Sequence, residues 1–492
     1  MKFFYIILLL LLLTIFKQSN SSNSAYSMDS EISKLWIKSK IEFTHSINDL
    51  NRSPLELYFI GINSYNILSY SFMYKKNKII DDLLDIYIQT TPYLTNSHKY
   101  TFSYLKYDER SSTRTLHNSY PIWLDKNGEE DILASSSFLR VVSLAINGIS
   151  NLPIKDKTSV MKKFVKKFSP IVSAHYRRWI LGVVSLDKRQ LLGSFQRRGW
   201  GCKNNKEEYI CARTLQEEII KLDSYKGDSY CNSMTDVVML INIGLGYYLS
   251  SNPDTIQKKK LTDFFKKSVH VFSTHFRPHV SYNFNKKAIT TLGFEEGLWS
   301  EHPDFHYSLY MDSEFPSKKH QKINREVGID ISHASTVVAF LEMLVAHQKY
   351  FDIEFPTASE MKMFSNRFLY NVFNGDFQKP LFRNYMNGSN GWFRASTKGY
   401  GYAPYNLTST ALVGGYPRLG VYSLELKKIF NEIMHKLHSK NPIDRAFIEN
   451  FYQKSVWSNY HLKNEYNFYA EDIDSHTALF LINFYSALRS TF

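Results

Sequence analysis

The segment Asp236-Val-Val-Met-Leu-Ile-Asn-Ile-Gly-Leu-Gly-Tyr-Tyr-Leu249 decides the fold class of this chain. It is a long apolar run that Asn242 and two glycines interrupt. A helix that spans a membrane needs about 20 consecutive apolar residues. The interrupted run therefore indicates a helix buried in the core of a globular protein.

Other segments with apolar residues at helical spacing flank this core helix. They are Leu133–Ile149, Thr214–Leu222, Leu261–Phe272, Ser335–Tyr350, Ser423–Leu437 and Thr477–Leu488. Aromatic and glycine-rich connections separate them, and strand signals are weak and scattered. The pattern predicts a mainly all-α fold with little β-structure, in which helical hairpins form an incomplete α/α toroid. Loops at one end of such a toroid form a long cleft that suits a polymeric substrate.

Two parts of the mature chain are expected. Residues 26–130 carry the least regular pattern and are predicted to be an N-terminal helical region packed on the toroid. Residues 131–492 are predicted to form the toroid domain that carries the chemistry. The chain is long enough to bury a large core without disulfides or metal ions.

The N-terminus resembles a signal peptide. Lys2 precedes an apolar run from Phe3 to Phe16, and small or polar residues follow as far as Ala25. A basic start, a short apolar block and a small-residue exit are typical of a secretory signal. Residues 1–25 are therefore predicted to be removed from a secreted protein, which then keeps no membrane span. The alternative is an uncleaved membrane anchor.

The composition of the chain limits the classes of partner that we expect it to bind. The formal net charge is +14 and is spread along the chain, so the protein would attract an anion. For an exported protein we expect an acidic polysaccharide, and no nucleic-acid-binding motif is present. The charge has the alternative role of keeping the protein soluble. Cys202, Cys211 and Cys231 allow one disulfide and leave an odd thiol, and no zinc-ligand spacing surrounds them.

Polar residues that favour chemistry gather in a few short segments. Asn232 precedes the core helix, and His302 stands in a segment rich in aromatic residues. Pro303 predicts a helix that starts just after His302, with Tyr307 and Tyr310 on one face. A histidine and a tyrosine close together can divide proton abstraction and proton donation. A helix cap followed by a packed aromatic stripe is the structural alternative.

Further candidates are binding residues. His333 follows Asp330 at a predicted helix start, where it either caps the helix or faces a cleft. The run that contains Tyr400 and Tyr402, with Trp392 nearby, is expected to stack on sugar rings or to pack as a loop. The predicted substrate-binding residues are Trp299, Tyr307, His333, Trp392, Tyr400 and Tyr402.

The sequence lacks the motifs that are typical of several enzyme classes. There is no nucleophile elbow, no cysteine protease signature, no P-loop and no dinucleotide fingerprint. No metal site and no cofactor are expected. Glu301, Asp304 and Asp330 could supply the carboxylate pair of a glycoside hydrolase, which is the second hypothesis. The third hypothesis is a glycan- or surface-binding protein without catalytic activity.

The order of the polar motifs is similar to that of a known enzyme family. Asn232-Ser233-Met234, then His302 with Tyr310 eight residues later, then Arg383-Asn384 resemble the toroid domain of chondroitin and hyaluronan lyases. This group includes the chondroitin lyase of the baculovirus occlusion-derived-virus envelope. The resemblance covers roughly residues 225–425, and the family's large C-terminal β-domain has no counterpart.

This resemblance implies a catalytic set of four residues. Asn232 would bind the uronate carboxylate, His302 or Tyr310 would take the C5 proton, and Tyr310 would protonate the leaving oxygen. Arg383 would hold the negative charge of the substrate or orient the tyrosine. Tyr307 competes with Tyr310 for the role of proton donor, and Arg325 competes with Arg383. The leading hypothesis is therefore a secreted lyase that cleaves an acidic, uronate-containing glycan by β-elimination.

Overall fold

The structure is a computed structural model that describes most of the chain. The described residues are 28–103, 114–126, 128–181, 183–184, 191–192, 195–196, 211–212, 215–224, 230–253, 257–398, 401–453 and 465–490. Most of them are helical, which confirms the expectation of a mainly all-α fold. The predicted signal peptide, Tyr400, Cys202 and the side chains of Cys211 and Cys231 lie outside what the structure describes.

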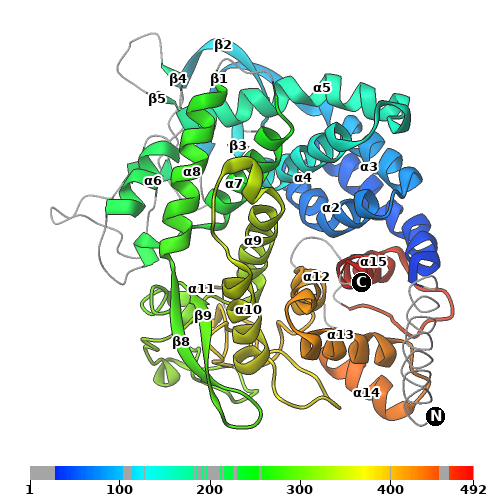
Figure 1. Ribbon diagram of the computed structural model, residues 1–492, viewed down its shortest axis with the longest axis vertical. Helices are drawn as coiled ribbons and strands as arrows, with labels where there is room; N and C mark the ends of the chain where they lie inside the picture. The colour runs from blue at the N-terminus through cyan, green and yellow to red at the C-terminus, as the bar shows by residue number, and fades with distance from the viewer. Residues whose placement is uncertain are drawn as a thin grey trace, which may run out of the picture.

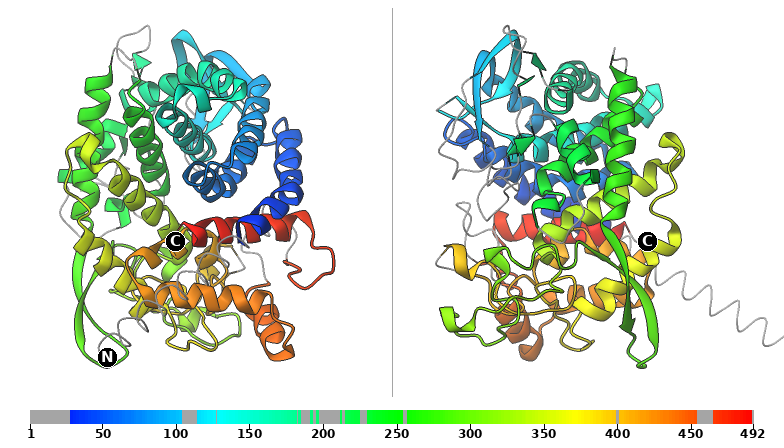
Figure 2. Two further views of the ribbon diagram at one scale, coloured as in Figure 1. Left: turned by 45° about the vertical axis from the view of Figure 1, so that its right-hand side comes forward. Right: turned by 90° about the vertical axis from the view of Figure 1, so that its left-hand side faces the viewer.

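Six helices pack side by side around one centre (Figures 1 and 2). They are α2 (Glu56–Met73), α4 (Ile132–Asn151), α7 (Asp236–Ser250), α9 (Ile331–Phe351), α12 (Thr410–Val413) and α15 (Ser475–Arg489). Each contacts the next in this order, and α15 contacts α2. The six inner helices therefore form a closed succession, although α2 and α15 lie far apart in the sequence.

A second set of helices lies outside the inner ones. They are a helix over residues 28–49, α3 (Asn77–Gln89), α5 (Ser159–Tyr176), α6 (Leu215–Ser224), α8 (Lys258–Thr274), α10 (Ala358–Arg367), α13 (Leu424–Leu437) and α14 (Pro442–Phe451). The outer helix α3 packs on α2, and α5 packs on α4. The chain thus supplies the inner helices with partners from neighbouring segments, as in helical hairpins.

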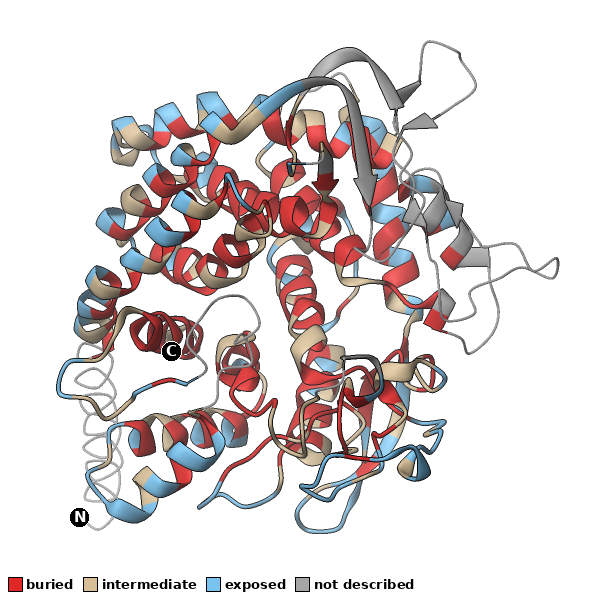
Figure 3. Ribbon diagram, turned by 180° about the vertical axis from the view of Figure 1, so that it is seen from behind, coloured by how far each residue is buried: buried red, intermediate tan, exposed pale blue. Residues whose placement is uncertain are grey.

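Apolar pattern separates the inner helices from the outer ones. In α7 every residue from Val237 to Leu249 is buried, as expected for a helix that is apolar on all sides. In α8 Leu261, Phe265 and Phe272 are buried, whereas its lysines face outward. Figure 3 shows the buried residues concentrated on the central helices. Among the described helices α4 alone is long and apolar enough to cross a membrane, and 89% of its apolar window is buried in the fold.

Glycines allow the inner helices to approach closely. A Cβ added at Gly61 of α2 would lie 2.5 Å from the backbone carbonyl of Ser137 in α4. A Cβ at Gly244 of α7 would lie 3.1 Å from the Cα of Arg140 in α4 and 2.1 Å from the hydroxyl of Tyr176. The separations of 2.5 and 2.1 Å are shorter than a Cβ permits and the one of 3.1 Å is tight, so glycine sets the spacing between α2, α4 and α7.

The strands form small sheets at the edges of the helical body. Strands β1 (Leu94–Ser103), β2 (Arg114–Trp123) and β3 (Glu129–Asp131) form a sheet in the order β2-β1-β3, with β1 antiparallel to β2 and parallel to β3. The hairpin of β8 (Phe276–Tyr282) and β9 (Ala288–Phe294) pairs Phe276 with Phe294 and Tyr282 with Ala288. Two-residue pairs join β4 (Val183–Val184) to β5 (Leu191–Leu192) and β6 (Phe195–Gln196) to β7 (Cys211–Ala212).

Buried ion pairs fix the sheets to the helices. Glu130, the middle residue of β3, accepts two hydrogen bonds from Arg178 in the π-helical turn η3 (Arg177–Leu181) that follows α5, at 2.5 and 2.8 Å. Arg367 at the end of α10 binds Glu296, just after β9, in the same bidentate way. Each guanidinium is buried together with its carboxylate, so neither charge is left unpaired.

The expected boundary near residue 130 falls between β3 and α4. The expected N-terminal region contains three of the strands as well as helices, and its helix α2 belongs to the closed succession. The two expected regions therefore share one set of core contacts. Long loops between α8 and α9 and between α10 and α12 gather at one end of the molecule, below the inner helices in Figure 1.

Candidate functional site

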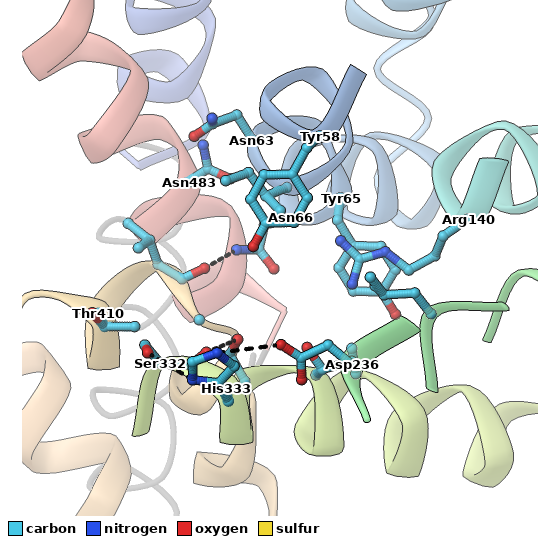
Figure 4. Close-up of a pocket in the computed structure, with 18 of the residues that line it drawn as sticks. Tyr58, Asn63, Tyr65, Asn66, Arg140, Asp236, Ser332, His333, Thr410 and Asn483 are labelled. Atoms are coloured by element: carbon cyan, nitrogen blue, oxygen red, sulfur yellow. Dashed lines mark hydrogen bonds and ion pairs between the residues drawn. The ribbon is translucent and has the colours of Figure 1, made fainter. Parts of the chain in front are cut away.

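A pocket of about 390 Å³ lies where the six inner helices meet. Its lining residues include Tyr58, Asn63, Tyr65, Asn66, Leu133, Arg140, Asp236, Leu240, Ser332, His333, Thr336, Glu342, Arg394, Tyr402, Thr410, Arg418 and Asn483. This volume is in the range of small-ligand sites. Figure 4 shows two facing walls, with Arg140 and Tyr65 on one side and His333 and Asp236 on the other.

His333 lies at the start of α9, on the wall opposite Arg140. Asp330 is the N-cap of α9 and accepts hydrogen bonds from the backbone N–H groups of Ser332 and His333. Its carboxylate also lies 2.7 Å from Nδ1 of His333. Nε2 of the same ring lies 3.5 Å from a carboxylate oxygen of Asp236, the first residue of α7. The imidazole is therefore held between two carboxylates.

These two carboxylates change the charge of the pocket wall. Burial works against a charged imidazole, but Asp330 and then Asp236 outweigh it and raise the pKa of His333 to about 9. His333 is therefore a cation at neutral pH. For Asp236 burial has the largest effect and raises the pKa of its carboxyl group.

Arg394 lies beside His333 and adds a second cation. Its Nη2 is 3.3 Å from Nε2 of His333, and its Nε is 3.2 Å from the carboxylate of Asp304. The backbone of the same loop is fixed, because Arg394 donates its N–H to the carbonyl of Asp304 and Phe393 pairs with Tyr402. Arg394 has a positive φ of 63°, which turns its side chain at the end of this pairing. His333 and Arg394 together make one wall cationic.

His302 lies next to these cations, in an aromatic cluster. Its ring packs edge-on against Tyr230, with the ring centroids 5.0 Å apart, and against Trp299 at 5.8 Å. Nδ1 of His302 accepts the backbone N–H of Asp304 at 3.2 Å. Burial is the main cause that lowers the pKa of His302 to about 4; Asp304 opposes this shift and Arg394 adds to it. His302 is therefore neutral at neutral pH, in contrast to His333.

The helix predicted after His302 is wrong in extent. A 3₁₀ turn of three residues, η5 (Pro303–Phe305), follows His302, and turns replace the helix before Tyr310. The side chain of His302 accepts from the backbone of this turn and so acts as its cap. Proline at the first position favours the turn, but the following residues pack as separate aromatic anchors rather than along one helical face.

The structure brings some of the predicted site residues together. Asn232 is buried in the turn η4 (Tyr230–Asn232), whose Tyr230 contacts His302 and stacks on Trp299. Nε1 of Trp299 donates to Glu295 at 3.0 Å. Asn232, Trp299 and His302 are therefore parts of one cluster beside the pocket.

Other predicted residues lie in a neighbouring aromatic cluster. Tyr307 and Trp392 are buried in one cluster, and Tyr310 packs against this cluster. Nε1 of Trp392 donates to the carbonyl of Asp312 at 2.7 Å. The ring of Tyr310 stacks on His320, with centroids 4.2 Å apart. Of the predicted aromatic binding residues that are described, Tyr402 lines the pocket.

Arg383 is directed to a different part of the molecule. Its Nη1 donates to the backbone carbonyls of Asn371 at 2.6 Å and of Phe373 at 3.2 Å. These contacts hold the loop after α10, and the catalytic role of Arg383 stays a prediction. Glu301 is exposed, whereas Asp304 and Asp330 bind the cations Arg394 and His333.

Sequence reasoning missed Arg394 and Arg140, both of which line the pocket. Arg394 follows Trp392-Phe393 in a loop, where a basic residue carries no distinct signal. Arg140 had a signal, because it is the one charged residue within the apolar run of α4. A lone arginine in a buried apolar helix indicates a polar partner in the interior. Among the described residues no group of three or more histidine, cysteine, aspartate or glutamate side chains is arranged to hold a metal ion.

Comparison with known proteins gives no relative: no protein-family model matches the sequence, and no curated protein or solved structure matches the chain.

Proposed function

We propose that this chain is a secreted lyase that cleaves a uronate-containing polysaccharide by β-elimination in the pocket between the inner helices. One observation supports the proposal: a neutral imidazole, His302, lies next to a cationic pair, His333 and Arg394, and this pair lines the pocket. Elimination needs both a base and positive charge that stabilises the carbanion next to the uronate carboxylate.

The arrangement of the helices supports the architecture that we propose. The inner helices contact one another in a closed succession, and neighbouring segments supply the outer helices. All six inner helices contribute to the pocket. An α/α toroid has these properties, and the resemblance to chondroitin and hyaluronan lyases points to the same architecture. Export directed by residues 1–25 would bring the enzyme to extracellular glycans.

The proposed reaction uses the two histidines in opposite states. His302 accepts the proton from C5 at Nδ1, which gives up its hydrogen bond from the backbone N–H of Asp304 when the substrate binds. The electron pair of the C5–H bond forms the C4–C5 double bond while the C4–O bond breaks. His333, Arg394 and the amide of Asn232 bind the carboxylate and stabilise its negative charge. Tyr402 lines the pocket and is our candidate for returning a proton to the leaving oxygen. Tyr310, predicted for that role, stacks on His320.

An absorbance assay tests this proposal. The protein is incubated with hyaluronan, chondroitin, heparan and alginate, and the ultraviolet absorbance of the unsaturated uronate is followed. We expect a rise with at least one polymer and a loss of at least about 100-fold in His302→Ala. His306→Ala is the matched control, because His306 is close in sequence and its ring contacts the backbone carbonyl of Glu301. No rise with any polymer contradicts the proposal.

A second candidate is a glycoside hydrolase on the same scaffold. Asp236 lines the pocket, and burial raises the pKa of its carboxyl group, as a general acid requires. This candidate predicts new reducing ends without the ultraviolet signal, and their loss in Asp236→Asn. Binding of the glycan without either signal would favour the third hypothesis, a binding protein.

A further inference from the structure

Arg140 is a buried cation in the middle of an apolar inner helix. It lies in α4, lines the pocket and exposes only 5% of its surface. Figure 4 shows its side chain beside Tyr65, on the wall opposite His333. A buried arginine keeps its charge, because the guanidinium does not lose its proton in proteins. The surroundings of Arg140 must therefore accommodate a full positive charge.

The described residues around Arg140 supply an aromatic ring and a backbone carbonyl rather than a counter-charge. Among the residues that the structure describes, no carboxylate lies within ion-pair distance of its guanidinium. The guanidinium lies 4.4 Å from the ring centroid of Tyr65, and Nη2 is 3.5 Å from the carbonyl oxygen of Gly61. Its Nε has no hydrogen-bond partner. Burial lowers the pKa of Arg140; Tyr65, Tyr58 and Tyr247 oppose this shift, and the nearby cation Arg418 adds to it.

Three other buried arginines of the protein, in contrast to Arg140, each bind a carboxylate. Arg178 binds Glu130, Arg367 binds Glu296, and Arg418 binds Glu342 at 2.6 Å. An uncompensated buried charge costs several kcal/mol, and a cation–π contact of about 2 kcal/mol does not offset it. A charge kept at such a cost is expected to have a partner that is bound from outside.

The pocket next to Arg140 offers room and further donors for an anion. Arg418 donates to Asn66 at 2.8 Å, and its Nε, like that of Arg140, lacks a hydrogen-bond partner. The pocket lining contains four cationic groups, Arg140, Arg394, Arg418 and His333, and two carboxylates, Asp236 and Glu342. Its volume of about 390 Å³ exceeds what one small anion needs, so the anion can be part of a larger ligand.

We propose that Arg140, with Arg418 beside it, forms an anion-binding site on the wall of the pocket formed by α2 and α4, which takes a sulfate, phosphate or carboxylate group. A ligand that spans the pocket then carries one anionic group here and a second one at His333 and Arg394. The assignment rests on the proposed function only in naming a glycan as the source of this group. A free inorganic anion is the other source of the same chemistry.

The first experiment measures anion binding without any turnover. The unfolding temperature of the full chain is followed while sodium sulfate or sodium phosphate replaces sodium chloride at constant ionic strength. We expect a saturable rise of about 2 °C at ten times the dissociation constant. In Arg140→Met the rise disappears, whereas Arg52→Met, which removes an exposed arginine, keeps it.

The stability of Arg140→Met without added anion is the decisive measurement. Methionine has a similar unbranched shape without a charge, so we expect the variant to unfold at the same or a higher temperature than the wild type. A lower temperature, or failure to fold, overturns the proposal, because it shows that the charge is compensated within the protein. Arg140→Lys retains a cation and should retain part of the response to sulfate; a complete loss in this variant also counts against a site based on charge.

A second experiment distinguishes the two sources of the anion. Uronate oligosaccharides with and without sulfate esters compete against inorganic sulfate, and binding is measured by calorimetry on wild type and Arg140→Met. If a glycan supplies the group, at least one oligosaccharide binds about tenfold or more weakly to the variant. If only the inorganic anions bind, the site stands and the glycan source is rejected. Absence of ultraviolet signal with preserved sulfate binding rejects the proposed function and leaves this site intact.

Discussion

His333 illustrates how single residues set the charge of the pocket. Its imidazole lies between Asp330 and Asp236, and although burial opposes it, these carboxylates raise its pKa to about 9. The folded pKa is above the unfolded value of about 6.5. The resulting stabilisation is fully present below about pH 6.5 and is lost as the pH rises through 9.

Replacing His333 by glutamine should remove this pH dependence. We expect the free energy of unfolding of the wild type to fall by about 1–2 kcal/mol more than that of His333→Gln between pH 6.5 and 9.5, since the side chain is partly exposed. Urea unfolding at several pH values measures this difference. The control His435→Gln removes an exposed histidine of α13 and should follow the wild type. Parallel curves for wild type and His333→Gln would contradict the assignment.

The two histidines also predict the pH profile of the proposed elimination. Activity should fall below about pH 4, where His302 becomes protonated and cannot act as a base, and above about pH 9, where His333 loses its charge. In His333→Arg the cation is permanent, so the alkaline limb should move upward while the acid limb stays near pH 4. The dependence of kcat/KM on pH measures both limbs, and an alkaline limb that does not move rejects the role of His333.

At the scale of the secondary-structure element, glycine permits the close contacts between helices. We expect Gly61→Ala to lower the free energy of unfolding by about 1–3 kcal/mol, because the added Cβ meets the backbone of Ser137 in α4. Gly148→Ala is the matched control: the three atoms nearest to its Cβ belong to the ring of Phe72, a side chain that can move, and not to backbone. Both variants gain the same helix propensity, so the difference between them reports the helix contact. Equal urea midpoints would show that α2 and α4 can separate.

The elements were predictable where apolar spacing was strong. Predicted helices such as Asp236–Leu249 and Ser423–Leu437 match α7 and α13 within one or two residues. The hairpin of β8 and β9 was not predicted, because its turn has no glycine pair. Instead, Asn283 accepts the backbone N–H groups of Asn285 and Lys287, and Lys286 adopts a positive φ of 59°. Such turn chemistry leaves a weak sequence signal.

The candidate site was harder to predict than the helices. Helix starts drew attention to Asn232 and His333, and an aromatic segment drew attention to His302. Arg394 reaches His333 only through a loop whose path depends on tertiary contacts such as the pairing of Phe393 with Tyr402. Arg140 is on the opposite wall because α4 and α9 face each other across the pocket. The spacing of residues in the sequence predicts neither the contact of Arg394 with His333 nor the position of Arg140 across the pocket.

At the scale of the whole molecule, Asp29 joins the two ends of the described chain. Its carboxylate accepts from Tyr70 at 2.8 Å and from Arg489 of α15 at 3.0 Å, and it lies 3.2 Å from Nζ of Lys76. Burial opposes the ionised form, but these three donors outweigh it and lower the pKa of Asp29. Its stabilising effect is therefore present above about pH 4 and lost as the pH falls through the lower, folded pKa.

Removing this carboxylate should weaken the closure between α2 and α15. We expect Asp29→Ala to lower the free energy of unfolding at pH 7 by about 1–3 kcal/mol, since it leaves the largely buried Arg489 without this partner. Asp49→Ala is the control, because Asp49 lies in the same helix as Asp29 (residues 28–49) and pairs with Arg52 at an exposed position. This substitution should change the free energy of unfolding by less than about 1 kcal/mol. Equal losses in the two variants would contradict a special role for Asp29.

The contact between α15 and α2 also has a consequence for how the protein is made. At this contact Asp29, from the helix over residues 28–49, bridges Tyr70 of α2 and Arg489 of α15, and Arg489 follows Asp29 by 460 positions. During synthesis α2 leaves the ribosome long before α15 exists, so the side of α2 that packs on α15 has no final neighbour for most of translation. The pocket, which needs both helices, is completed only after nearly the whole described chain has emerged. Ribosome-bound chains halted before residue 475 should therefore resist protease less than the finished protein and should bind no ligand in the pocket.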